Sequence, residues 1–231
     1  MPNTVIKVII PAYNEERSIG AVIKEIPKIV DEVIVVDNCS IDRTAEEARM
    51  AGATVLRETQ MGYGYACLKG MAYLAELKTP PDIVVFLDGD YSDYPEELEK
   101  LVAPILEQKV DFVVGARAKA LQEPGSMTLQ QRFGNRLATT LMKYIFGSSF
   151  TDLGPFRAIR YQTLLDLKMQ DKTYGWTVEM QLKVLKRNIS YIEIPVRYKK
   201  RIGVSKVSGT IKGTIFAGYK ILSWIFKYSL K

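Results

Sequence analysis

Short apolar runs alternate with segments of helical periodicity along most of this chain. A short apolar run bounded by turn residues predicts a buried strand. We therefore expect strands at residues 5–10, 32–36, 54–56, 83–87, 112–114, 156–159 and 191–197. Strand, helix and strand at this spacing are typical of right-handed βαβ units, so the pattern predicts an α/β fold with a mostly parallel central sheet flanked by helices.

The segments between these runs show helical periodicity. It predicts helices over residues 42–50, from Gly62 to about 77, over 96–108 and over 129–146. A further helix is expected directly after the first strand, with Asn14 as its N-cap and Glu15 and Glu16 in its first turn, where the helix dipole favours acidic groups. Residues 118–128 are polar and contain Gly and Pro, which predicts a loop.

The last segment, residues 209–231, has the pattern of a basic amphipathic helix. Lysines gather on one side and apolar residues on the other: Lys212, Lys220, Lys227 and Lys231 against Ile211, Ile215, Tyr219, Leu222 and Phe226. Such a helix can lie at a membrane surface or pack its apolar face on the core, and both can hold at once. The lysines interrupt it too often for it to span a bilayer. We expect one catalytic domain over residues 1–208, followed by this helix.

Composition narrows the chemistry. The chain has 231 residues with 47% hydrophobic residues, enough for a real core, and a formal net charge of +6 that favours an anionic partner. Histidine is absent, so acid–base and metal chemistry fall to carboxylates. The two cysteines lack metal-ligand spacing, and no signal peptide is visible, so a cytoplasmic protein is expected. No aromatic and basic stacking surface supports nucleic-acid binding.

Acidic and polar residues follow several of the predicted strands. Asp88 and Asp90 flank a glycine after the apolar run at 83–87, while Asn14-Glu15 and Asp37 follow earlier strands. The carboxyl ends of parallel strands meet at one edge of an open α/β sheet, where such folds bind ligands. Carboxylates there suit a hard divalent cation that bridges phosphates, so we expect Mg²⁺ or Mn²⁺ at Asp88 and Asp90.

These motifs, in this order and spacing, resemble a known family. Residues 8–15 (VIIPAYNE), 35–44 (VVDNCSIDRT) and 87–90 (LDGD) look like the nucleotide-binding half of a family-two glycosyltransferase with the GT-A, Rossmann-like fold. Residues 152–157 (DLGPFR), 174–180 (YGWTVEM) and 198–206 (YKKRIGVSK) resemble one branch, the dolichyl- or polyprenyl-phosphate sugar synthases. Mannosyl members of that branch usually read Thr-Ser-Gly-Phe-Arg where this chain has DLGPFR.

The resemblance implies a role for each matching residue. Pro11, Tyr13 and Glu15 would contact the base and ribose, and Asp37 would hold the nucleoside. Asp88 would touch the ribose or the metal shell, and Asp90 would ligate the metal. The remaining matching residues would bind phosphate groups. Arg117 and Arg132 would receive the acceptor phosphate or the donor diphosphate. Arg201, Ser205 and Lys206 would close over the leaving diphosphate.

The expected reaction is transfer of a hexose, with inversion, from UDP-glucose or GDP-mannose to a polyprenyl phosphate at the cytoplasmic face of a membrane. An acceptor phosphate is already ionised and needs no strong base. A hydroxyl acceptor would need one, with Asp152 or Glu179 as candidates. The alternatives are the same fold acting on a soluble hydroxyl or phosphorylated acceptor, and a binding protein that holds nucleotide sugar without turnover.

Overall fold

The computed structural model describes residues 4–203 and 211–229, and the side chains of 4–203 and 216–229. Within these ranges the strands form a single seven-stranded sheet in the order β3-β2-β1-β4-β6-β5-β7. The strands are β1 Ile6–Ala12, β2 Glu32–Asn38, β3 Thr54–Glu58, β4 Ile83–Phe86, β5 Phe112–Gln122, β6 Arg157–Arg160 and β7 Tyr191–Tyr198. Only β6 among them runs antiparallel to its neighbours. The predicted α/β fold with a mostly parallel sheet is confirmed.

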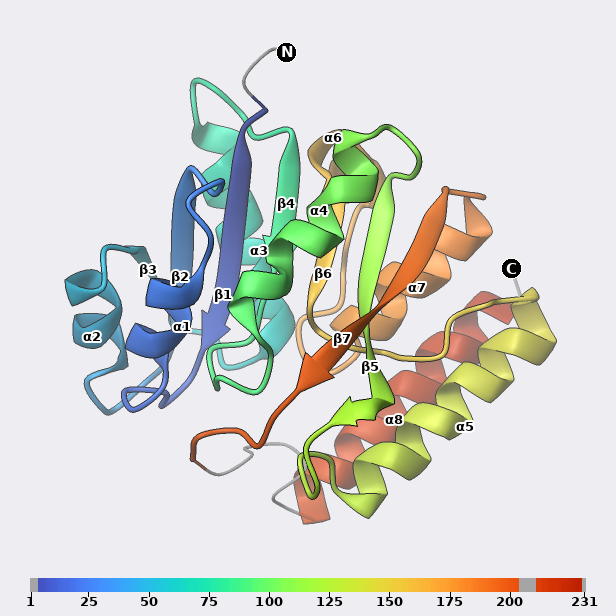
Figure 1. Cartoon of the computed structure of the whole chain (residues 1–231). Coiled ribbons are helices and arrows are strands. Elements are labelled where there is room, and N and C mark those ends of the chain that lie inside the picture. The colour runs from blue at the N-terminus through green and yellow to red at the C-terminus, as the bar shows by residue number, and fades with distance from the viewer. Residues whose placement is uncertain (1–3, 204–210, 230–231) are drawn as a thin grey trace.

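Helices cover both faces of the sheet (Figure 1). One face carries α1 Ile19–Glu25, α2 Thr44–Met50 and α4 Leu98–Leu106, which begins after a 3₁₀ turn at Pro95–Glu97. The other face carries α3 Tyr63–Glu76, α5 Leu129–Phe146, α6 Tyr161–Leu167, α7 Trp176–Lys186 and α8 Ile211–Ser229. A hydrophobic core lies on each face of the sheet. Successive residues of a central strand point to opposite faces, so Ile9 is buried in one core and Ile10 in the other, and such strands are apolar throughout.

The predicted helix after Asn14 is wrong. The chain instead forms a turn, and α1 begins only at Ile19. Asn14 lies in the left-handed region at φ 54°, a conformation that Asn tolerates but that cannot start a helix. Side chains from the loop after β2 and from the start of α2 hold this turn, since the Asn14 amide donates to Ser40 Oγ at 3.0 Å and the Glu15 amide to Thr44 Oγ1 at 2.7 Å. Glu15 is therefore a buried turn residue at the end of β1.

The predicted loop at 118–128 is wrong in its first half, because β5 continues to Gln122. The extension pairs with β7 at Gln122 and Tyr198, beyond a register irregularity. Pairing with a strand this distant in sequence outweighs the polar local composition. The following helix begins where predicted, with Thr128 and Gln131 forming a capping box that satisfies two backbone N–H groups.

The C-terminal helix α8 packs beside α5 on the sheet's second face (Figure 1). Trp224 and Ile225 are buried in that core, while Phe216, Tyr219 and Phe226 point outward. The division of faces therefore differs from the predicted one, because Tyr219 and Phe226 lie outside and the Lys220 ammonium turns toward the protein. No helix in the described part of the chain is long and apolar enough to cross a membrane.

Candidate active site

The carboxyl ends of β1, β2 and β4 meet at one edge of the sheet and form a cavity of about 370 Å³. The structure brings Pro11, Tyr13 and Glu15 from the β1 turn together with Asp88 and Asp90 from the β4 loop. Asn38, the segment from Met61 into the first turn of α3, Tyr174 and Arg201 also line it. This cavity, called the donor cavity below, lies where open α/β sheets bind nucleotides.

Two carboxylates stand on the floor of the donor cavity. Asp88 Oδ1 accepts a hydrogen bond from the Tyr63 hydroxyl at 3.0 Å. Asp90 Oδ1 accepts from the amide and hydroxyl of Ser92, at 2.9 and 2.5 Å. The second oxygen of Asp90 faces Arg201, with Nη1 to Oδ2 at 3.0 Å. These contacts fix the orientation of both acids before any ligand binds.

Carboxyl groups are crowded together at this end of the sheet, which makes their ionisation harder. Burial and the neighbouring Asp90 charge raise the pKa of Asp88 to about 7. Burial, with Asp88 and Asp90 beside it, also raises the pKa of Asp93 well above its usual range. Among the described residues neither carboxyl oxygen of Asp93 has a hydrogen-bond partner. The arrangement is short of positive charge, and Arg201 supplies part of it.

Arg201 bridges the two sides of the donor cavity. Its Nη2 lies 2.8 Å from Glu15 Oε1, and its Nη1 contacts Asp90. Backbone hydrogen bonds hold the segment around Arg201 against the loop after β4. Ile202 N donates to Asp90 O at 2.9 Å, and Lys199 N donates to Ser92 O at 2.9 Å. The cationic side chain of Arg201 is therefore held beside the acids of the cavity floor by ion pairs and by the hydrogen bonds of its segment.

Some predicted site residues lie elsewhere or outside the described residues. Asp37 is buried at the end of β2, where its Oδ1 accepts from Ser40 N at 3.2 Å, and it does not line the cavity. The neighbouring Asn38 lines it instead. Ser205 and Lys206 fall within 204–210, outside the described residues.

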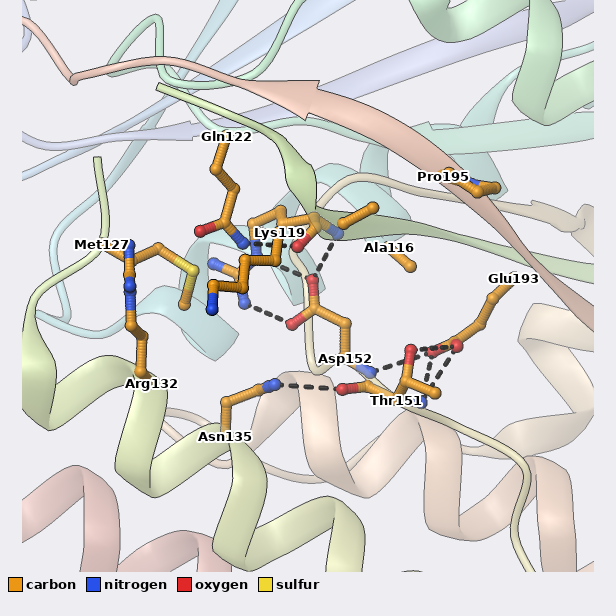
Figure 2. A pocket seen from close by; sticks show the side chains of 12 residues that line it. Ala116, Lys119, Gln122, Met127, Arg132, Asn135, Thr151, Asp152, Glu193 and Pro195 are labelled. Carbon is orange, nitrogen blue, oxygen red and sulfur yellow. Dashed lines mark hydrogen bonds and ion pairs between the residues drawn. The ribbon is translucent and has the colours of Figure 1, made fainter. Parts of the chain in front are cut away.

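A second cavity, of about 530 Å³, lies between β5, the start of α5 and the 151–152 segment (Figure 2). We call it the acceptor-side cavity. Arg117 and Asp152 form a buried pair there, with Nε to Oδ2 at 2.8 Å and Nη2 to Oδ1 at 2.6 Å. The Arg117 charge and hydrogen bonds outweigh the effect of burial and lower the pKa of Asp152. A carboxylate held this way is a poor base.

Unpaired cations also line the acceptor-side cavity. Lys119 and Arg132 are exposed there, and neither has an ion-pair partner among the residues the structure describes. Arg132 and Asn135 reach the cavity from α5 (Figure 2). The Asn135 side chain also holds the 151–153 segment, because its Oδ1 accepts a hydrogen bond from Leu153 N at 2.8 Å. With Arg117 paired to Asp152, the remaining charged side chains of the lining are Lys119, Arg132 and Glu193, which leaves an excess of positive charge.

Asp93 marks where the two cavities adjoin. The charges acting on its carboxyl come from Asp88 and Asp90 on one side and from Arg117 and Asp152 on the other. The Arg117 guanidinium also lies 5.1 Å from the ring centroid of Tyr198, the residue paired with Asp93. Asp93 and Tyr198 thus connect the acids of the donor cavity with Arg117 of the acceptor-side cavity.

Asn38, Tyr63 and Tyr174 line the donor cavity but are not among the predicted site residues. Asn38 was detectable, because it follows Asp37 at a strand end. Tyr63 sits between two glycines that lack the pattern of a dinucleotide fingerprint, and its contact with Asp88 spans 25 residues. No local pattern in the sequence indicates it.

Glu179 has a structural place in this fold. It is fully buried on α7, forms an ion pair with Lys183 at 2.6 Å, and accepts from the amides of Gln170 and Asp171. A side chain so fully engaged cannot serve as a base for a hydroxyl acceptor, and it lines neither cavity. The ion pair with Lys183 at helical i, i+4 spacing follows from the sequence.

The acids of the donor cavity fit a divalent cation, which would need further ligands from a bound phosphate. The two acids of the floor offer oxygen ligands to such an ion, and Asp90 already attracts the cationic Arg201. In the described part of the chain, no three His, Cys, Asp or Glu side chains are arranged to hold an ion alone. Asp90 and Asp88 would therefore share it with a ligand.

Comparison with known proteins gives consistent matches. A family profile described as glycosyl transferase family 2 matches residues 7–167. An uncharacterized glycosyltransferase of Mycobacterium tuberculosis is 33% identical over 94% of this chain and 96% of its own length. A dolichyl-phosphate hexose transferase of Haloferax volcanii is 33% identical over 87% of this chain and 85% of its own.

Among solved structures, glucosyl-3-phosphoglycerate synthase from Mycobacterium tuberculosis superimposes with a TM-score of 0.77. The match covers 98% of this chain and 78% of that one at 22% identity, so it establishes a shared fold. That structure is a complex with Mn²⁺, UDP and phosphoglyceric acid.

Proposed function

This chain belongs to glycosyl transferase family 2, and we propose that it transfers a hexose, with inversion, from a nucleoside diphosphate sugar to a polyprenyl phosphate. In that reaction an acceptor phosphate oxygen forms a bond to the anomeric carbon as the bond from that carbon to the donor diphosphate breaks. The products are a polyprenyl phosphate sugar and a nucleoside diphosphate. UDP-glucose and GDP-mannose are the leading donors.

The donor cavity supplies the nucleotide half of the proposal. Pro11, Tyr13 and Glu15 would contact the base and ribose, and Asn38, which lines the cavity where Asp37 does not, would contact the nucleoside. Arg201 would face the donor diphosphate, with Ser205 and Lys206 following it in the chain. A guanidinium fixed beside the leaving group stabilises the negative charge that develops as the bond breaks.

A divalent ion, Mg²⁺ or Mn²⁺, would be held by Asp90, with Asp88 beside it. Its chemistry is to neutralise charge on the donor diphosphate. Tyr63 and Ser92 hold the two carboxylates in place by hydrogen bonds at 3.0 and 2.9 Å. The protein's own contribution is thus a preoriented pair of acids at the cavity floor.

The acceptor-side cavity would take the acceptor phosphate. Arg132 and Lys119 line it without an ion-pair partner among the described residues, and Arg117 is aimed by its bidentate pair with Asp152. An ionised phosphate needs no general base, which agrees with the lowered pKa of Asp152. Asp152 then positions Arg117 for the acceptor.

The observation that favours a lipid acceptor is an apolar stripe on α5 beside this cavity. Leu129 and Phe133 are 81% and 71% exposed, and Leu137 follows one turn later. These residues flank Arg132, so a phosphate bound at Arg132 would have its hydrocarbon chain next to exposed apolar side chains. The neighbouring α8 also carries exposed apolar side chains, Phe216 and Tyr219. Such a surface suits peripheral contact with the cytoplasmic face of a membrane.

A soluble phosphorylated acceptor is the second candidate. It is favoured by the shared fold with glucosyl-3-phosphoglycerate synthase and by the size of the acceptor-side cavity, about 530 Å³. Both acceptors present the same chemistry to Arg132, a phosphate oxygen. The two acceptors differ in the rest of the molecule, which would be exposed to water in a soluble acceptor and would contact the apolar stripe of α5 in a lipid acceptor.

A transfer assay with radiolabelled UDP-glucose, UDP-N-acetylglucosamine and GDP-mannose in turn tests the proposal. Each reaction contains Mn²⁺ and undecaprenyl phosphate, with Asp90→Ala as the control. We expect label in the organic phase, lost in the variant. Label that passes only to added 3-phosphoglycerate would replace the lipid by a soluble acceptor, and binding of a nucleotide without any turnover would indicate a binding protein.

A further inference from the structure

Asp171 lies fully enclosed between α8 and the loop before α7, although it lines neither cavity. Its Oδ1 accepts from the amides of Thr173 and Gly175 at 2.8 and 2.9 Å. Its Oδ2 accepts from the indole Nε1 of Trp224 at 2.6 Å and faces the Lys220 ammonium at 3.3 Å. One oxygen thus holds the 171–175 loop and the other holds the C-terminal helix.

The 171–175 loop lies directly against the first turn of α3. Tyr65 N donates to Lys172 O at 3.0 Å, and Gly64 N to Thr173 O at 3.3 Å. A Cβ at Gly64 would stand 2.0 Å from Asp171 O, so only glycine permits this approach. The two glycines that flank Tyr63 therefore serve the contact with this loop.

Both partners of that contact form a wall of the donor cavity. Tyr174 lines it from the loop, Tyr63 from the first turn of α3, and Gly62 from the N-cap position just before that helix. Tyr63 in turn donates to Asp88 on the cavity floor. Hydrogen bonds thus link Trp224 through Asp171 and the loop to the backbone of Gly64 and Tyr65, and the adjoining Tyr63 side chain reaches Asp88.

We propose that Asp171 is a positioning residue for the donor cavity, held in place by Trp224 and Lys220 of the C-terminal helix. That the donor cavity binds a nucleotide rests on the proposed function. Helix α8 would then be part of the nucleotide site as well as a surface helix, and loss of its contact with Asp171 would weaken donor binding.

The packing around Asp171 leaves little room for independent movement. A Cβ at Gly175 would lie 2.5 Å from the Trp224 ring and 2.6 Å from Asp171 Oδ2. Trp224 itself is buried, and Glu179 fixes the chain before the loop by accepting from the Asp171 amide at 2.7 Å. A charge-assisted bond in such a place is strong, and its loss leaves a buried carboxylate oxygen short of a donor.

Three variants test the proposal. Trp224→Phe removes the indole N–H while keeping a ring, and Asp171→Asn places an amide N–H where Trp224 and Lys220 need an acceptor. The third combines both changes. Phe226→Leu, on the exposed side of the same helix, is the matched control. Calorimetric titration of each protein with UDP and with GDP, in Mn²⁺, gives the dissociation constant and the fraction of competent protein.

We expect the dissociation constant of the nucleotide that wild type binds to rise about 5- to 10-fold in each single variant. The double variant should be no weaker than the worse single one, because both changes break one contact. The control should match wild type. A lower binding stoichiometry with an unchanged dissociation constant would mean a purely structural contact and would overturn the proposal, as would equal weakening in the control.

Hydrogen exchange separates this inference from the proposed function. The amides of Gly64 and Tyr65 should exchange faster in Trp224→Phe and Asp171→Asn than in wild type, without any nucleotide. If wild type binds neither nucleotide, the proposed donor class fails while exchange still tests the coupling. Unchanged exchange at these amides would overturn the coupling whatever the nucleotide result.

Discussion

The guanidinium of Arg201 lies 3.0 Å from the carboxylate of Asp90, Nη1 to Oδ2, across the floor of the donor cavity. The same side chain reaches Glu15 at 2.8 Å. A tethered cation thus occupies the carboxylate to which we assign the metal. Nucleotide and metal would have to displace or share this contact, so Arg201 acts on both.

Arg201→Ala should change metal and nucleotide binding in opposite directions. Without nucleotide, removal of the competing cation should tighten Mn²⁺ binding several-fold, since a partly exposed ion pair contributes about 1 kcal/mol. With Mn²⁺ present, UDP or GDP should bind more weakly because the diphosphate loses a positive partner. Electron paramagnetic resonance of free Mn²⁺ measures the first effect. Weaker Mn²⁺ binding in the variant would contradict the competition.

Arg132→Ala should raise the KM for the acceptor by tenfold or more, with the donor KM close to that of wild type. A charged hydrogen bond to phosphate is worth about 1.5–3 kcal/mol, which corresponds to that factor. Arg136→Ala is the control, because Arg136 is exposed on the same helix but does not line the cavity. Equal loss in both variants would show a general charge effect.

Leu129→Ser combined with Phe133→Ser should reduce partition onto anionic liposomes and raise the KM for undecaprenyl phosphate. Both side chains are largely exposed, so the fold should keep its stability. Burial of each in a bilayer would contribute about 1.5–3 kcal/mol, so the loss should be 10-fold or more. Co-sedimentation with vesicles measures it. Wild-type partition in this variant would place membrane contact elsewhere.

Asp152→Asn should destabilise the protein at neutral pH but much less in acid. The pKa of Asp152 is lowered from its ordinary value of 3.8, so its ion pair stabilises the fold above that pH. The contribution begins to be lost as pH falls through 3.8 and disappears below the lowered folded pKa. Breaking a buried pair costs about 3–5 kcal/mol, because Arg117 stays buried.

Urea unfolding of wild type and of Asp152→Asn at pH 7, 5, 4 and 3 measures this difference in the free energy of unfolding. Other carboxylates titrate in both proteins, so the difference isolates the pair. If the difference in the free energy of unfolding between the two proteins stayed constant over this pH range, the ion pair with Arg117 would not be what lowers the pKa of Asp152.

The strand order along the chain and the strand-end acids were predictable because they depend on local pattern. Asp88 and Asp90 follow an apolar run, and parallel strands bring such ends together. The turn at Asn14 was not predictable, since its conformation is fixed by contacts from the loop after β2. The extension of β5 likewise required its partner strand.

The sequence by itself determined the fold class, the acidic floor of the donor cavity and the presence of basic groups for phosphate. Only the tertiary structure decided which polar groups pair: Arg117 with Asp152, Arg201 with Asp90 and Glu15, and Trp224 with Asp171. Apolar periodicity is a property of neighbouring residues, whereas these pairs join segments far apart in the chain. Their choice depends on how the layers pack, which no local pattern encodes.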